Sequence, residues 1–264
     1  MAVYDVRSIS QVGTSEPFEL QVARGQIPGH SVIHVFGHNP DVDDDDEATV
    51  WPIPGALLGH PASPTIMKIS SSSANDTAAG TGARTVQILG VNGTGGYAEE
   101  IVTLNGQTAV DTVNTYDAIE RMTVLTVGSG GVNAGTIYAG TGTVTNGVPA
   151  VPYSAIGVGD NLSLVGHWTC PTGFTGYLVA GKLTTGTTAG SQYILGKLKL
   201  RGTDGITRTA AITTLAEATA WYDFTYPIKI SAGECITATA TGRGNNNDVS
   251  SYFQIVLIKE QGPL

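Results

Sequence analysis

The chain has 264 residues and a net charge of −9, with charged side chains at only 13% of positions and hydrophobic residues at 41%. This hydrophobic fraction predicts a folded core and excludes a disordered chain. The acidic balance argues against nucleic acid or an anionic membrane as partner, because both attract clustered Lys and Arg.

Residues 1–60 are predicted to form an extended N-terminal arm. Its prolines recur too often for helices; they are Pro17, Pro28, Pro40, Pro52 and Pro54. The first ten residues lack the basic region followed by an apolar run that marks a signal peptide, and no apolar run reaches the roughly 20 residues of a membrane span. We therefore expect synthesis in the cytoplasm and no membrane partner.

The arm contains an acidic run in which Asp41, Asp43 and Asp45 match the first three ligand positions of a calcium loop. The remainder departs from that pattern, because Asp46 replaces the required glycine and Pro52 replaces the bidentate glutamate. We interpret the run as a solvated acidic loop, with a looser Ca²⁺ or Mg²⁺ site as the alternative.

Three histidines of the arm, His30, His34 and His38, are four residues apart. On a helix this spacing would build a zinc-binding face. The surrounding residues are β-branched or aromatic and favour a strand, on which residues four apart are separated by about 13 Å. Surface or interface histidines are therefore expected instead of a metal site.

Residues 61–145 are predicted to form a first β domain. Two strands, Arg84–Val91 and Glu100–Leu104, flank the turn-forming run 92–96, and Asn105-Gly106 follows as a second tight turn. Asn-Gly and Gly-Gly steps supply the positive φ angles of hairpin turns. The run 80–84 superficially resembles a phosphate loop, but it precedes a strand and lacks the helix N-terminus that binds phosphate.

Residues 153–264 are predicted to form a C-terminal antiparallel β-sandwich, similar to a jelly roll. Ile194–Arg201 alternates apolar and basic residues, and Tyr252–Lys259 is apolar on both faces near its centre, as expected for an interior strand. Thr213–Thr219 is the one helical candidate. Cys170 and Cys235 are interpreted as buried free thiols, with a disulfide as the alternative. The predicted fold class is thus all-β, with one or two sandwich domains after the arm.

An aromatic run, residues 221–226, includes Trp221, Tyr222 and Tyr226 as a candidate glycan or partner patch. The alternative is a sandwich core, where aromatic side chains bury large areas. The sequence has no nucleophile elbow, P-loop or dinucleotide-binding motif, so we expect neither an enzyme nor a cofactor.

Two segments carry a family resemblance. Arg24–Trp51, RGQIPGHSVIHVFGHNPDVDDDDEATVW, resembles the N-terminal region of small structural proteins of tailed bacteriophages of aquatic bacteria, and Ile69–Ile137 is similar to the same group. The resemblance covers roughly the first half of the chain. It implies a virion structural protein, that is, a head decoration (cement) protein, another head accessory or a tail component, and it implies no catalytic residues.

The leading hypothesis is therefore a capsid decoration protein on the virion surface, a homotrimer that binds the major capsid protein and copies of itself. The contact residues expected in the arm are Arg24, Ile27, His34, Phe36 and Trp51. The alternative is a tail fibre, receptor-binding or other tail or neck module, in which the C-terminal sandwich binds glycans through its aromatic run.

Overall fold

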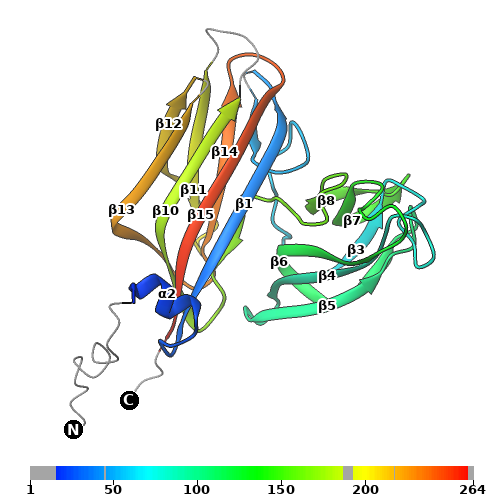
Figure 1. Cartoon of the computed structure of the whole chain (residues 1–264), viewed down its shortest axis with the longest axis horizontal. Coiled ribbons are helices and arrows are strands. Elements are labelled where there is room, and N and C mark those ends of the chain that lie inside the picture. The colour runs from blue at the N-terminus through cyan, green and yellow to red at the C-terminus, as the bar shows by residue number, and fades with distance from the viewer. Residues whose placement is uncertain (1–15, 45, 187–192, 217, 261–264) are drawn as a thin grey trace.

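The computed structural model describes residues 16–44, 46–186, 193–216 and 218–260, and nearly all regular structure in these ranges is β (Figure 1). The helix among them is α2 (Phe18–Ala23), and none of the described helices is long and apolar enough to span a membrane. The strands form two lobes, a sandwich and a separate curled sheet. The prediction of an all-β, antiparallel sandwich protein is confirmed.

The sandwich contains both the first and the last strands of the described residues. Its strands are β1 (His30–Val42), β2 (Glu47–Thr49), β9 (His167–Thr169), β10 (Phe174–Gly186), β11 (Ile194–Arg201), β12 (Thr207–Leu215), β13 (Thr219–Ile230), β14 (Cys235–Gly242) and β15 (Asn247–Lys259). One sheet has the order β1-β15-β10-β13, and the other β12-β11-β14-β2, with β9 also paired to β14. Val35, Leu178 and Phe253 of the first sheet share a core with Ile194 and Ile236 of the second.

The second lobe lies between β2 and β9 in the chain, and we call it the inserted domain. Its strands are β3 (Thr65–Ser71), β4 (Ala83–Asn92), β5 (Tyr97–Thr103), β6 (Val110–Val127), β7 (Ile137–Thr145) and β8 (Val148–Ile156). They form one six-stranded antiparallel sheet in the order β5-β4-β6-β3-β7-β8. Met67, Ile88 and Met122 lie at the centre of its separate core.

The N-terminal segment departs from the extended arm predicted for residues 1–60. In Figure 1 the blue strand β1 lies beside the red strand β15, and the two pair from His30 opposite Ile258 to Val42 opposite Asn247. β2 pairs with β14 in the other sheet. Pro40 lies at a register shift in β1, a place where a strand tolerates proline. Frequent prolines are thus compatible with a strand here, and residues 30–49 complete the C-terminal sandwich.

The remaining predicted elements have mixed outcomes. The hairpin of β4 and β5 is confirmed, with Gly95 of its turn at a φ of 79°. Tyr252–Lys259 lies in β15 between β1 and β10, as expected for an interior strand. The helix predicted at Thr213–Thr219 is wrong, because pairing with β11 keeps this chain extended as far as Leu215. Cys170 and Cys235 are both free and buried.

A buried carboxylate organises the loop before β4. Asp76 is fully buried and accepts hydrogen bonds from the backbone N–H groups of Ala83, Ala134 and Gly135 at 2.7, 2.8 and 2.9 Å, and from the Ser71 hydroxyl at 2.6 Å. These bonds join the loop to the segment before β7. The Ser- and Gly-rich segment before β4 is therefore a structural loop built around the carboxylate of Asp76.

Candidate functional site

Four side chains form a row across the outer face of the first sandwich sheet. Strand pairing places Phe36 opposite Tyr252, Tyr252 opposite Lys182, and Lys182 opposite Trp221. Side chains alternate between the faces of a sheet, so the buried neighbour Phe253 points to the core while Tyr252 points outward. We call Phe36, Tyr252, Lys182 and Trp221 the aromatic row.

The rings of the row contact one another around Tyr252. Its ring centroid lies 5.0 Å from that of Phe36, 5.9 Å from that of His34 and 6.3 Å from that of Trp221. The Tyr252 hydroxyl lies 2.8 Å from His34 Nδ1, and the Trp221 indole N–H donates to Asp223 Oδ1 at 2.7 Å. Phe36 and Trp221 are nevertheless 47% and 52% exposed. The row therefore presents apolar ring faces to solvent in fixed orientations.

A groove of about 790 Å³ runs along the row at the boundary with the inserted domain. Its lining adds Arg121 of β6 and Leu162 to the row. The Arg121 guanidinium donates to the backbone carbonyl of His34 at 2.6 Å, which holds this cation in the lining of the groove. The surface thus combines aromatic faces with two cationic side chains, in a chain that is acidic overall.

Residues from both predicted contact sets meet around Tyr252. His34 and Phe36 come from the set expected to contact the capsid, and Trp221 comes from the candidate glycan patch. Sequence reasoning missed Tyr252 and Lys182, which connect the two sets. The sequence carried no clear signal for Tyr252, because Tyr252–Lys259 is apolar on both faces near its centre, and the burial that separates Tyr252 from Phe253 is seen only in the structure.

The other expected contact residues lie elsewhere. Trp51 is 1% exposed and its indole N–H donates to the Ala56 carbonyl at 3.0 Å, so the expectation that it forms part of a surface is corrected. Arg24 follows α2 and is exposed, with an ion pair to Glu16. Ile27 is half-buried in the turn before β1. None of these three lines the groove.

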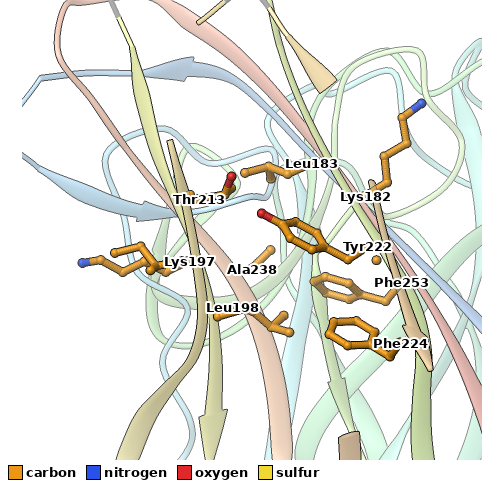
Figure 2. A pocket seen from close by; sticks show the side chains of 13 residues that line it. Lys182, Leu183, Lys197, Leu198, Thr213, Tyr222, Phe224, Ala238 and Phe253 are labelled. Atoms are coloured by element: carbon orange, nitrogen blue, oxygen red, sulfur yellow. The ribbon is translucent and has the colours of Figure 1, made fainter. Parts of the chain in front are cut away.

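Two aromatics of the candidate glycan patch are also separated from the row. Figure 2 shows Tyr222 beside Phe224 and Phe253 in a narrow space between the sheets, with Leu198 opposite. This cavity measures about 50 Å³, room for a few water molecules at most and too little for a sugar ring. Tyr226 is 89% exposed but does not line the groove. Only Trp221 of that patch belongs to the aromatic row.

The acidic run packs beside the hairpin between β14 and β15. The carboxylate of Asp43 accepts a hydrogen bond from the Asn246 backbone N–H at 3.1 Å, and its carbonyl accepts one from Gly242 at 2.9 Å. Asp41 is half-buried, and Asp45 lies outside the described residues. The weak Ca²⁺ or Mg²⁺ hypothesis for this run stays a prediction.

Polar contacts of β9 with β5 and β6 hold the inserted domain against the sandwich. Glu120 accepts from the Thr169 backbone N–H at 3.0 and 3.1 Å with its two oxygens, and the Trp168 indole N–H donates to the Tyr97 hydroxyl at 3.1 Å. Burial raises the pKa of Glu120 to about 8, although hydrogen bonds from Thr169 act in the opposite direction. These contacts place the neighbouring Arg121 at the groove.

No protein-family model and no curated protein matches the chain. Among solved structures, the chain is similar to that of the infectious bursal disease virus Gx strain, with 10% identity over 88% of this chain and 71% of that chain and a TM-score of 0.21. The VP2 subviral particle of the same virus shows 11% identity over 88% and 72% of the two chains, with a TM-score of 0.21. Similarity at this level carries no conclusion about function.

Proposed function

We propose that the chain is a structural protein of a bacteriophage particle, a decoration (cement) protein that docks on the major capsid protein through the aromatic row. The observation that carries this proposal is the exposure of Phe36 and Trp221 around Tyr252 on one sheet face. Exposed aromatic groups with adjacent cations are typical of protein-binding surfaces. The resemblance of residues 24–51 and 69–137 to tailed-phage structural proteins supports the virion assignment.

The modest size of the row suits a protein present in many copies. Symmetric repetition converts weak single contacts into strong attachment, because each bound copy holds its neighbours at high effective concentration. We include self-association as a homotrimer in the proposal, with the trimer located where capsid subunits meet. In this role the chain has no catalytic activity and needs no cofactor.

A sedimentation assay with capsids that lack the protein tests the proposal. The double variant Phe36→Ala, Trp221→Ala should bind at least about tenfold more weakly than the unmodified chain, because central aromatics dominate interface energies. Tyr226→Ala is the matched control, since it removes an exposed aromatic from β13 outside the groove. Equal binding by the double variant, with an unchanged melting temperature, would contradict the docking surface.

A receptor-binding tail module is the second candidate function. It is favoured by the nearly parallel rings of Trp221 and Tyr252, with an interplanar angle of 24°, beside the carboxylate of Asp223. Flat ring faces stack on sugars, and a carboxylate accepts bonds from their hydroxyls. Glycan-array binding that is lost in Trp221→Ala supports this function. Hundreds of copies per purified particle support decoration, whereas a few to some tens support the tail.

A further inference from the structure

Three ligand-type side chains meet where the linker into the inserted domain passes the sandwich. His60 lies on the linker between β2 and β3, His167 on β9, and Cys235 at the start of β14. One nitrogen from each imidazole and the thiol sulfur all lie within 4.8 Å of one another. β9 and β14 are paired strands, so the sheet fixes two of the three groups and the linker delivers the third.

Hydrogen bonds orient His167 and Cys235 toward a common point. The Thr169 hydroxyl lies 3.1 Å from His167 Nε2 and donates to Cys235 Sγ at 3.3 Å. The other ring nitrogen, His167 Nδ1, lies 2.8 Å from the Thr237 hydroxyl. A histidine that binds a metal through one nitrogen is usually held by such a bond at the other. His167 Nε2 and Cys235 Sγ share the Thr169 hydroxyl as a neighbour, so binding of an ion through Nε2 and Sγ requires this hydroxyl to give up its two hydrogen bonds, while the bond of Nδ1 to Thr237 remains.

We propose that His60, His167 and Cys235 bind a zinc-class divalent cation, with a water molecule as fourth ligand. Two imidazoles and one thiolate form a donor set that zinc prefers. In a tetrahedral zinc site such donor atoms lie about 3.3–3.6 Å apart. Closure of the site therefore requires only a small inward movement, which the half-buried His60 on its linker provides.

A cavity of about 320 Å³ gives the ion access. Two of the three proposed ligands, His60 and Cys235, line this cavity, and His167 does not. Thr169, Asp117 and Arg201 also belong to the lining. The space admits a hydrated ion and leaves room for the water ligand. The positive charge of Arg201 repels a bare divalent cation. The same positive charge favours the Cys235 thiolate. The negative charge of that thiolate in turn cancels one of the two positive charges of the ion.

The ionisation of the ligands is compatible with metal binding at neutral pH. Burial, with a smaller contribution from Arg201, lowers the pKa of His60 to about 4, so its imidazole is in the neutral form that binds metals. Burial raises the pKa of Cys235 to about 11. The cation must therefore displace the thiol proton, and each ion bound releases one proton to solvent as the metal–sulfur bond forms.

Titration of the reduced, full-length protein with Co²⁺ tests the site. We expect the near-ultraviolet charge-transfer absorption of a cobalt–thiolate bond, the visible bands of tetrahedral cobalt, release of one proton per ion, and displacement by Zn²⁺. Cys235→Ser should abolish the charge-transfer band. His60→Ala should weaken Co²⁺ binding at least about tenfold, the effect of losing about 1.4 kcal/mol.

Two control variants separate this site from other thiols and histidines. Cys170→Ser removes the other buried thiol, and His38→Ala removes a histidine of β1, so both should keep the cobalt spectrum. Absence of the band in the folded wild-type protein at millimolar Co²⁺ overturns the proposal, as does a band lost in Cys170→Ser but kept in Cys235→Ser. If Cys235→Ser does not fold, His60→Ala decides, and unchanged affinity in that variant overturns the site. The outcome does not depend on the proposed capsid role.

Discussion

The inserted domain and the sandwich are both antiparallel, but they are assembled over different distances along the chain. In the inserted domain, short turns join β4 to β5 and β7 to β8. In the sandwich, β1 pairs with β15, so that His30 lies opposite Ile258. Local pairings form at little entropic cost, whereas pairing of distant strands requires closure of a long loop. The two lobes therefore differ in what their folding requires of the rest of the chain.

Removal of residues 1–50 gives the largest expected effect. The deletion takes β1 and β2 out of both sheets and removes Val35, Val42 and Val50 from the core, so the sandwich should not fold. Thermal melting followed by circular dichroism should show that the unfolding transition of the sandwich is lost and that of the inserted domain is retained. A folded sandwich in this deletion would show that β1 is dispensable.

Deletion of residues 1–50 does not test which surface binds the capsid. A truncation that unfolds the sandwich abolishes binding whatever surface makes the contact. Point substitutions at Phe36 and Trp221 avoid the difficulty, because both side chains are about half exposed, at 47% and 52%.

The sequence predicted the elements whose signals are local. The turn residues 92–96 predicted the β4–β5 hairpin, and alternation predicted the strand at Ile194–Arg201. The role of β1 was not predictable in this way, because its partner β15 lies at the other end of the chain. The predicted helix at Thr213–Thr219 failed for the same reason, since pairing with β11 overrides a weak local preference.

The candidate site was predictable only in pieces. His34, Phe36 and Trp221 were each identified in their own segments, but strand register alone brings them together around Tyr252. A shift of one residue in the pairing of any one of these strands would turn that strand's side chains to the core face and break the row. Single-segment patterns do not specify register between distant strands, so the row follows from the structure.

Asp76→Ala should destabilise the inserted domain without affecting the sandwich. The substitution leaves the N–H groups of Ala83, Ala134 and Gly135 without their acceptor, and each buried unpaired group costs about 1–3 kcal/mol. We expect a loss of at least about 3 kcal/mol in the unfolding free energy of this lobe. The control Asp111→Ala removes an exposed carboxylate whose ion pair with Lys68, at 3.1 Å, contributes at most about 1 kcal/mol. Equal losses in the two variants would contradict the organising role of Asp76.

Gly37→Ala tests how tightly β1 is built into the sandwich. A Cβ at this position would lie 2.5 Å from the Val50 carbonyl oxygen and 2.6 Å from the Gly166 nitrogen. Because both neighbours are backbone atoms, overpacking should cost about 1–3 kcal/mol in denaturant unfolding of the sandwich. Gly186→Ala is the matched control at the end of β10, where a Cβ would meet none of the described residues within 4 Å. A stability of Gly37→Ala equal to that of the control would show that β1 moves away freely.

The contact between the lobes should weaken as pH rises. Folding raises the pKa of Glu120 from an ordinary 4.5 to about 8, so the folded protein retains a proton that the unfolded chain releases within this window. Stability is then fully present below pH 4.5 and is lost as pH rises toward 8, by up to about 1.4 kcal/mol per pH unit. Urea unfolding at pH 7 and pH 8 measures this slope. Glu120→Gln should flatten it, because the amide does not titrate. Identical slopes in the wild type and Glu120→Gln would show that the carboxyl is ionised in the folded contact, and the two lobes would then be joined by a charge instead of a neutral acid.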